Sequence, residues 1–429
     1  MSKIPESSFF VYRHGVLHCE AVDLAVIAKE VGSPTYVYSW NAIQQAYNTV
    51  DQALAHTPHQ ICYAVKANSN LAILKRLGKL GCGADIVSGG ELARALEAGI
   101  PAERIVFSGV GKTDAEIESA LAVGVRSLHV ESAPELDAVE AIAARMGRAA
   151  PIALRVNPNV DPKTHAYIAT GLKKSKFGVA METARELLPR ILKSPHLHLE
   201  GLASHIGSLI GGAVAMRDAV EAVARLAVEF KAAGAPLTTL DAGGGWPISY
   251  GDEEHPPEPY SAYGAAIREG LVRGGAGELG LELIVEPGRC IVGDAGVLLT
   301  QVIFVKEQSE KRFVIVDAAM TELIRPALYD AYHAVVPVRA PAADAEHTPA
   351  DLVGPVCESG DFLALDRPLP ALARGELLVL RGAGAYGASM GSNYNSRPRA
   401  CEVLVDGPQF HVIRKRERPE DQWRNEQMK

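Results

Sequence analysis

The chain has 429 residues, too many for one ordinary hydrophobic core, so we expect two domains. Hydrophobic residues make up 48% and charged residues 22%, proportions typical of a globular protein with ample apolar material. The net charge of −8 disfavours nucleic acid or an anionic membrane as the main partner, and no apolar run reaches the roughly 18 residues of a membrane-spanning helix.

Six cysteines are spread along the chain without a CxxC pair, so the sequence predicts neither a metal site nor a redox motif. The N-terminus, MSKIPESSFF, lacks the basic segment and the long apolar run of a signal peptide. Free thiols suit a reducing compartment. We therefore expect a cytoplasmic protein.

Short apolar runs alternate with longer helical patterns between about residue 40 and residue 290. Segments with helical spacing lie between several runs, most clearly at 90–99 and 217–233. Strand–helix alternation favours a parallel sheet, and eight repeats in about 250 residues favour a (β/α)8 TIM-like barrel over an open sheet. The eight runs typical of strands are 60–65, 83–87, 104–108, 126–130, 151–156, 199–204, 238–242 and 282–286.

The pattern changes after residue 290, where short β-rich runs and turns replace the alternation. The clearest runs are 297–305, 312–317 and 376–381, and a polar loop is expected over 339–350. FFVYRHGVLHCE, near the N-terminus, is typical of a hairpin. We expect an α/β barrel domain over residues 39–290, and a β-rich domain, a barrel or sandwich, formed by residues 1–38 with 291–429.

Chemically unusual residues lie at the ends of five predicted barrel strands. Lys66 follows the first strand, Asp85 and His205 end the second and sixth, Gly243–Gly245 follow the seventh, and Glu286–Arg289 end the eighth. Working residues of such barrels lie just past the C-terminal ends of the strands. Packing alone does not explain five such coincidences, so the pattern predicts an active site at this end.

Lys66 closes the apolar run YAVKAN, which would hold its amine at a strand end. A partly desolvated lysine loses its proton more easily and can form a Schiff base. The simpler interpretation is a lysine that extends from a strand end into water, and a lone lysine would favour it. The neighbouring motifs reverse this preference.

Two other strand-end motifs are typical of cofactor binding. Gly243–Gly245 offer N–H groups without Cβ atoms where barrels place a phosphate, and Ser208 could add a hydroxyl. Glu286 offers a carboxylate that keeps a pyridine nitrogen protonated. A tight turn and a surface ion pair explain the same residues without a cofactor. His205 could stack on a ring or act as a base, and Asp85 could orient a neighbour.

The β-rich part adds three segments. IRPALY places Arg325 and Tyr329 four residues apart, on one face if the segment is a helical turn. GPVCESGD places Cys357 and Glu358 between glycines, although a loop cysteine is more often inert. GAYGASM places Tyr386 in a glycine-flanked loop that could approach a cofactor.

Together these motifs resemble the diaminopimelate decarboxylase family, which forms L-lysine from meso-2,6-diaminopimelate. The resemblance runs nearly end to end, and nine motifs in order are highly specific where each alone is weak. The related fold type III enzymes share a barrel plus a β-rich domain, as in alanine racemase. The motifs are YAVKAN, GCGADIVSGGEL, RVNPNVDPKTHAYIATGLKKSKFG, SHIGS, GGG, EPGR, DAAMTELIRPALYDAYH, GPVCESGD and AGAYGASMGSNYNSRPR.

The resemblance implies pyridoxal 5′-phosphate as the cofactor. Lys66 would bind it covalently, His205 would stack on its ring, Glu286 would pair with its nitrogen, and Cys357 would donate a proton. Residues expected around the cofactor are Asp85, Ser208, Gly244, Gly245, Pro287, Gly288, Arg289 and Tyr386. Residues expected to contact the amino-acid substrate are Arg289, Arg325, Tyr329, Glu358 and Tyr386.

The resemblance also implies a head-to-tail homodimer in which Cys357 and Glu358 enter the partner's site. It implies a mobile lid over 161–178. Two places depart from the family pattern: Trp246-Pro247 after the glycines, where a smaller pair is expected, and THAYI in the lid, where a proline commonly follows the histidine. They bear on the geometry of the cofactor loop and on the rigidity of the lid.

Two alternatives stay open on the residues. One is decarboxylation of ornithine, arginine or carboxynorspermidine, but these substrates lack a distal carboxylate beside the distal amine. Arg289 and Arg325 with Glu358 instead suit a distal zwitterion. The other is a catalytically silent pyridoxal-phosphate-binding protein of the same fold, which loss of Lys66 or Cys357 would favour, and both are present.

Overall fold

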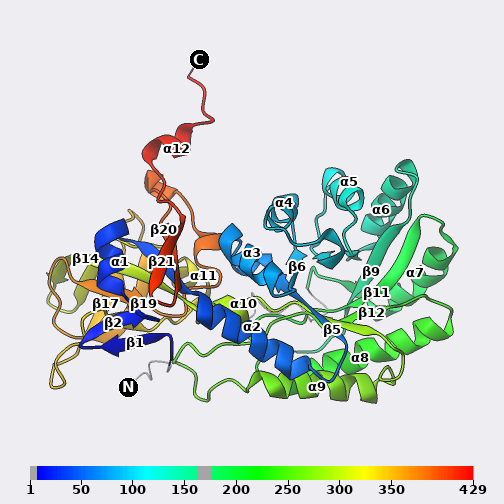
Figure 1. Ribbon diagram of the computed structural model, residues 1–429, viewed down its shortest axis with the longest axis horizontal. Helices are drawn as coiled ribbons and strands as arrows, with labels where there is room; N and C mark the ends of the chain where they lie inside the picture. The colour runs from blue at the N-terminus through cyan, green and yellow to red at the C-terminus, as the bar shows by residue number, and fades with distance from the viewer. Residues whose placement is uncertain (1–6, 162–174, 429) are drawn as a thin grey trace. The chain divides into compact units, whose positions relative to one another are not determined.

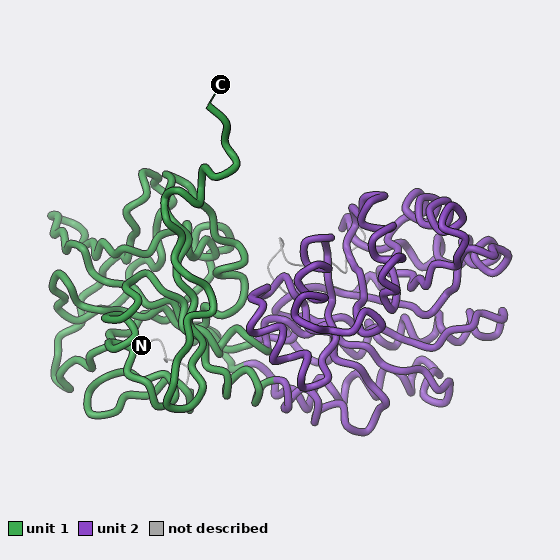
Figure 2. Tube along the Cα trace, turned by 45° about the horizontal axis from the view of Figure 1, so that its top comes forward, with its two compact units in different colours: residues 1–46, 248–256, 291–429 green, residues 47–247, 257–290 purple. Residues whose placement is uncertain are grey.

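The computed structural model describes residues 7–161 and 175–428. The chain divides into two compact units, shown in different colours in Figure 2. Unit 1 comprises Met1–Ala46, Ile248–Pro256 and Ile291–Lys429, and unit 2 comprises Tyr47–Pro247 and Pro257–Cys290. The domain limits expected from the sequence, residues 39 and 290, stay a prediction.

Unit 2 is built on a closed barrel of eight parallel strands. Each strand pairs with the next along the chain, and the last, β13, pairs with the first, β5, which closes the ring. A short strand β10 (Val179–Ala180) pairs with β9 outside the ring. The barrel strands are β5 (His59–Ala64), β6 (Gly83–Ile86), β7 (Ile105–Phe107), β8 (Ser127–Val130), β9 (Ala150–Asn157), β11 (Leu197–Ala203), β12 (Thr239–Asp241) and β13 (Glu282–Val285). Every one overlaps a strand predicted from the apolar runs, and the predicted barrel is confirmed.

Helices connect these strands and surround them, as Figure 1 shows. The helices predicted at 90–99 and 217–233 are α4 and α8. Polar N-caps start several of them: the side chains of Ser88 and Ser132 accept from the amides of Glu91 and Glu135. The helices are α2 (Trp40–Leu54), α3 (Leu71–Lys79), α4 (Gly89–Glu97), α5 (Asp114–Val123), α6 (Ala133–Arg145), α7 (Met181–Lys193), α8 (Ala213–Ala232), α9 (Tyr260–Arg273) and α10 (Arg289–Val292), with 3-10 turns η1 (Val65–Ala67) and η2 (Ala102–Arg104).

Unit 1 is β-rich, as predicted. A three-stranded sheet has the order β1-β2-β3, and a larger sheet has the path β18-β17-β15-β14-β4-β20-β21, with β19 joining β14 to β16. The strands are β1 (Phe10–Arg13), β2 (Val16–Cys19), β3 (Val22–Asp23), β4 (Thr35–Ser39), β14 (Gly296–Glu307), β15 (Arg312–Val316), β16 (Val335–Pro337), β17 (Thr348–Val353), β18 (Phe362–Leu369), β19 (Leu377–Leu380), β20 (Cys401–Asp406) and β21 (Gln409–Arg414). The helical segments are α1 (Leu24–Val31), α11 (Arg325–Tyr329), η4 (Ala388–Met390), η5 (Tyr394–Ser396) and α12 (Pro419–Trp423).

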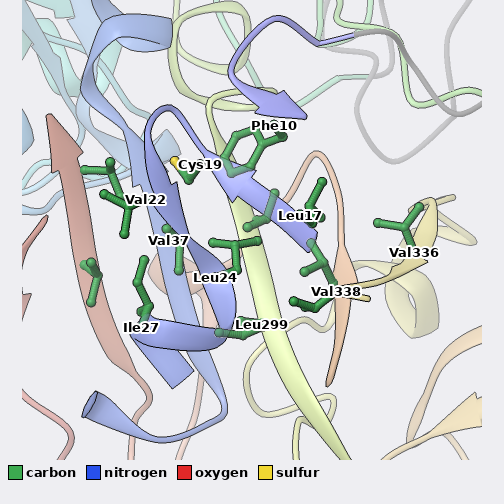
Figure 3. Close-up of a cluster of buried hydrophobic side chains, with 14 of the residues drawn as sticks. Phe10, Leu17, Cys19, Val22, Leu24, Ile27, Val37, Leu299, Val336 and Val338 are labelled. Carbon is green, nitrogen blue, oxygen red and sulfur yellow. The ribbon is translucent and has the colours of Figure 1, made fainter. Parts of the chain in front are cut away.

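The hairpin predicted in FFVYRHGVLHCE is the β1–β2 pair. Its inward side chains pack with α1 and with residues of the larger sheet in a buried cluster, part of which Figure 3 labels. The polar loop predicted over 339–350 is wrong at its end, because Thr348–Ala350 pair with β18 and belong to β17. Cross-strand pairing outweighs the Pro and Ala content of that segment.

Within the described ranges, none of the helices combines the length and the apolar character needed to span a bilayer.

Candidate active site

The C-terminal ends of the barrel strands bring Lys66 and Asp85 together. Lys66 lies in η1, two residues past the end of β5, and Asp85 lies on the neighbouring strand β6. Lys66 Nζ is 2.5 Å from Asp85 Oδ2, and the lysine side chain is 33% exposed while that of Asp85 is fully buried. The amine is thus held by one carboxylate oxygen and still reaches solvent, as a nucleophile for a bound molecule must.

His205, two residues past β11, is neutral and has a defined tautomer. Its Nδ1 accepts a hydrogen bond from the Gly244 N–H at 3.0 Å, so Nδ1 carries a lone pair. Burial, then the charges of Arg155 and Lys66, holds the pKa of His205 well below its usual value. The ring therefore offers a neutral face and an Nε2–H group beside the glycine loop.

Glu286, the residue after β13, is a buried carboxyl group among other acids. It is 6% exposed, and its Oε2 lies 3.8 Å from His205 Nδ1. Burial first, then the charges of Asp241 and Asp85, raises its pKa well above the usual value. A bound cation would favour the ionised form of Glu286 by the same electrostatics.

The triple glycine leaves no room for side chains. A Cβ atom at Gly244 would lie 2.0 Å from the carbonyl oxygen of Glu286, and one at Gly245 would lie 2.1 Å from that of Gly207. Gly243 and Gly245 also have φ values of +71° and +91°, in the left-handed region that glycine favours. The loop thereby packs its backbone directly against the SHIGS and EPGR segments.

Arg289 and Ser208 meet beside this loop. Arg289 Nη2 donates to Ser208 Oγ at 3.0 Å, although the arginine is only 6% exposed. The EPGR segment is fixed to the lysine turn, because the Ala64 N–H donates to the Pro287 carbonyl at 3.0 Å and a Cβ atom at Gly288 would touch Ala64. All the residues predicted from the barrel half thus gather at one end of the barrel.

Trp246, one of the two departures from the family pattern, is 1% exposed. Its ring stacks on Tyr263 of α9 with ring centroids 5.5 Å apart. The large side chain therefore fills the space between the glycine loop and α9. The other departure, THAYI, lies outside the described residues, as does most of the segment expected to form a lid.

Cys357 and Glu358 lie exposed in the loop between β17 and β18 of unit 1. The Cys357 N–H donates to Asn395 Oδ1 at 2.9 Å. Asp361 braces the loop, because its carboxylate accepts from the amides of Met320 and Val356, each at 2.6 Å. The thiol and the carboxylate are thus presented on a fixed loop.

Arg325 begins α11 and is 3% exposed. Its Nη1 donates to His333 Nε2 at 2.9 Å, and its guanidinium lies over the Tyr250 ring, 4.8 Å from the centroid. The segment forms the helical turn α11, which carries the half-buried Tyr329 one turn later, so the condition for a shared face is met. Tyr386, between Gly384 and Gly387, is also half-buried and has a φ of +55°.

Three polar residues that the sequence interpretation missed complete the cluster around Glu286. Ser108 follows β7, His129 lies on β8 and Asp241 ends β12, and each is at most 2% exposed. A ring nitrogen of His129 and one carboxylate oxygen each from Asp241 and Glu286 all lie within 4.8 Å of one another. The rule that selected Asp85 and His205, a polar residue at a strand end, would have found them.

Comparisons with known proteins agree over nearly the whole chain. A family model described as "Pyridoxal-dependent decarboxylase, pyridoxal binding domain" matches residues 40–293. Diaminopimelate decarboxylase of Neisseria meningitidis serogroup B is 49% identical over 410 residues, covering 96% of this chain and 97% of the relative. That of Pseudomonas aeruginosa is 48% identical over 98% of this chain and 99% of its own length.

Solved structures of similar proteins share the fold. Diaminopimelate decarboxylase from Helicobacter pylori, solved with L-lysine, has a TM-score of 0.88 and 44% identity, covering 94% of this chain and 98% of that one. Diaminopimelate decarboxylase from M. jannaschii, also solved with L-lysine, has a TM-score of 0.93 and 34% identity, covering 98% of both chains.

Proposed function

This chain belongs to the diaminopimelate decarboxylase family of pyridoxal-dependent enzymes, and we propose that it decarboxylates meso-2,6-diaminopimelate to L-lysine and CO2. It is a carboxy-lyase of amino-acid metabolism. The observation that carries the proposal is that the partly exposed amine of Lys66 and the buried carboxyl group of Glu286 lie at one barrel end, in a chain whose relatives match it over nearly its whole length.

The residues at the barrel end suit pyridoxal phosphate, the cofactor of this family. Lys66 offers a partly exposed amine, and the buried Glu286 carboxyl group can pair with a ring nitrogen. The Ser208 hydroxyl and the backbone N–H groups of the glycine loop, which packs directly against the SHIGS and EPGR segments, offer polar groups for a phosphate. When bound, the cofactor supplies an electron sink for the electrons left by CO2.

Lys66 would hold the cofactor through its amine, and Asp85 would orient that amine. The neutral His205 would lie beside the ring of the cofactor, and Glu286 would stabilise its protonated nitrogen through a negative charge. Cys357 Sγ would return a proton to the carbon that has lost CO2.

The substrate contacts in this proposal follow from charge. The distal end of diaminopimelate carries both a carboxylate and an ammonium group, and Arg289 and Arg325 suit the carboxylates while Glu358 suits the ammonium. Tyr329 and Tyr386 add hydroxyl groups. Ornithine and arginine have no distal carboxylate, so an arginine in this role would select against them.

We also propose a homodimer in which Cys357 and Glu358 of one protomer enter the site of the other. The support is the family resemblance of the GPVCESGD loop and its exposed, braced geometry in unit 1. A reducing cytoplasm is the proposed compartment, because all six cysteines are free thiols.

The test is CO2 release from meso-diaminopimelate, ornithine, arginine and carboxynorspermidine, each with saturating pyridoxal phosphate. We expect diaminopimelate to have a kcat/KM at least about 100-fold above the others, the discrimination that a buried charge pair supplies. A higher kcat/KM for any other amino acid would refute the substrate assignment. Cofactor binding without CO2 release from any of the four would favour a silent binding protein.

A further inference from the structure

A row of buried polar side chains connects Glu286 to Asp241 near the C-terminal ends of the barrel strands. Ser108 Oγ lies 3.2 Å from Glu286 Oε1 and 3.1 Å from His129 Nδ1. His129 Nε2 in turn lies 3.9 Å from Asp241 Oδ2. His129 and Asp241 lie on β8 and β12, Ser108 and Glu286 directly follow β7 and β13, and none of the four is more than 6% exposed.

Chemistry allows one proton arrangement along this row when Glu286 is ionised. An ionised carboxylate only accepts, so the Ser108 hydroxyl donates to Glu286 and accepts from His129 Nδ1–H. A neutral imidazole carries one N–H, so His129 Nε2 then has a lone pair that faces Asp241 Oδ2. These two atoms are compatible when the Asp241 oxygen carries a proton.

The electrostatics of His129 and Asp241 agree with a neutral imidazole and a protonated Asp241. Burial, then the charge of Lys112, lowers the pKa of His129 to about 3, so the imidazole stays neutral. Burial raises the pKa of Asp241 to about 7. The other Asp241 oxygen, Oδ1, accepts from the Gly243 N–H at 2.7 Å, which leaves Oδ2 to hold the proton. Burial also raises the pKa of Glu286, so Glu286 is the ionised acid of the two when a cation, here the protonated ring nitrogen, is bound beside it.

Two buried polar atoms without hydrogen-bond partners also support a proton on Asp241. Among the described residues, His129 Nε2 and Asp241 Oδ2 are buried atoms without a hydrogen-bond partner, and they face each other. A proton on Asp241 Oδ2 would give each atom a partner after a movement of less than about 1 Å. Ionised Asp241 would instead repel both the Nε2 lone pair and Glu286.

We propose that Ser108, His129 and protonated Asp241 are positioning residues that hold Glu286 ionised, so that Glu286 recognises the ring nitrogen of the cofactor. The inference rests on the proposed function, since that function supplies the partner of Glu286. The row donates one hydrogen bond to the Glu286 carboxylate and keeps the nearby acid neutral. Of the two acids Glu286 and Asp241, only Glu286, which is proposed to contact the cofactor, then carries a negative charge.

The test compares the affinity of the apoprotein for pyridoxal phosphate with that for its 1-deaza analogue, in which a C–H group replaces the ring nitrogen. We expect the wild-type protein to prefer pyridoxal phosphate and Glu286→Gln to lose most of that preference. Ser108→Ala and His129→Phe should lower the ratio of the two affinities about tenfold, the effect of losing a hydrogen bond to a charged group. Their affinity for the deaza analogue should stay within about threefold of wild type, whereas a general folding defect would weaken both ligands equally.

Two variants of Asp241 test whether this residue acts as a neutral acid or as an anion. Asp241→Asn should keep the wild-type ratio, because the amide oxygen accepts from Gly243 and the amide N–H donates to His129, as protonated Asp241 does. Asp241→Leu should lower the ratio as His129→Phe does. A ratio that falls in Asp241→Asn as far as in Asp241→Leu would overturn the proposal, because Asp241 would then act as an anion.

Matched variants keep the test interpretable. Ser127→Ala removes another buried serine, at the start of β8, and should leave the ratio unchanged. If His129→Phe does not fold, His129→Asn serves in its place: its amide can replace Nδ1–H and should keep the ratio, and a tenfold loss would count against the row. Failure of the wild-type protein to form a covalent adduct with pyridoxal phosphate would overturn the proposed function itself, which separates the two failures.

Discussion

Lys66 shows how one residue acquires a role from its surroundings. Its amine is held 2.5 Å from a fully buried carboxylate, yet a third of the side chain remains exposed. A lysine that only extended into water would not need a buried partner. The pair therefore fits a lysine that must be both oriented and accessible.

Lys66→Ala should abolish the visible absorbance of bound pyridoxal phosphate and the trapping of the cofactor by borohydride, because the amine that forms the covalent bond is lost. Mass spectrometry of the reduced, digested protein reads the attachment site. Lys75→Ala, an exposed lysine on α3, is the control and should behave as wild type. Trapping at another lysine in Lys66→Ala would show that the assignment is wrong.

Asp241 should also make the stability of the apoprotein depend on pH. Its folded pKa of about 7 lies above the value of about 3.9 expected in the unfolded chain, so the folded state binds a proton that the unfolded state has lost. The resulting stability is fully present below about pH 4 and is lost as the pH rises through about 7.

Asp241→Asn removes this titration. Relative to wild type, the variant should therefore gain free energy of unfolding when the pH rises from 5 to 8. Urea unfolding of both apoproteins at the two pH values measures the difference. An equal change in wild type and variant would mean that Asp241 is ionised across the whole range.

The loop after β12 illustrates the scale of the element. Two of its glycines have positive φ, and all three bring backbone within contact distance of other strand ends. A Cβ atom at Gly244 would lie 2.0 Å from the Glu286 carbonyl oxygen, a backbone atom that cannot turn away. The loop thus packs tightly between the ends of β11 and β13, and a larger residue in it would push these strand ends apart.

Gly244→Ala should destabilise the apoprotein by about 1–3 kcal/mol, the usual effect of overpacking, and should weaken cofactor binding. Denaturant unfolding and cofactor titration measure the two effects. Gly111→Ala is the matched control, because a Cβ atom there meets nothing within 4 Å. If both variants are equally stable, the loop has more freedom than its contacts indicate.

The loop between β17 and β18 carries the second element-scale prediction. Glu358→Gln keeps the size of the side chain but loses the charge proposed to bind the distal ammonium group. KM for diaminopimelate should rise about tenfold, the effect of losing a charge-assisted hydrogen bond, while the absorbance of the bound cofactor stays unchanged. Glu310→Gln, at an exposed site outside this loop, should leave KM at the wild-type value. An unchanged KM in Glu358→Gln would remove the charge argument for the substrate.

At the scale of the whole molecule, the proposed dimer predicts complementation between two inactive variants. Lys66→Ala and Cys357→Ala should each be inactive alone. In a mixed dimer one site carries both lesions, and the other combines wild-type Lys66 from one chain with wild-type Cys357 from its partner. After subunit exchange, activity should approach about a quarter of wild type, if half of the dimers are mixed and each has one good site.

Native mass spectrometry of the mixture reports how many dimers are mixed. A mixture of Lys66→Ala with Lys66→Ala,Cys357→Ala is the matched control, since no combination of those chains restores a site. Proven exchange without recovered activity would mean that Cys357 acts in its own chain or is not the proton donor.

Much of the fold could be predicted from the sequence because the signals for it are local. Apolar runs and helical spacing identified all eight barrel strands and helices α4 and α8, and the β-rich texture after residue 290 was correct. Strand ends were predicted less accurately: β17 begins at Thr348, inside the predicted loop, because pairing with β18 decides where the strand starts. The order of the motifs was enough to indicate the family and its cofactor.

What only the tertiary structure decided is which polar groups meet. Ser108, His129, Asp241 and Glu286 are separated by up to 178 residues, and the closure of the barrel, not any local pattern, brings them within hydrogen-bonding range of one another or nearly so. The closure of the barrel also brings Arg289 to its hydrogen bond with Ser208, and the Gly244 N–H to its hydrogen bond with His205. Sequence determines the residue types and their periodicity, whereas protonation and tautomer depend on burial and on neighbours that the chain supplies from distant strands.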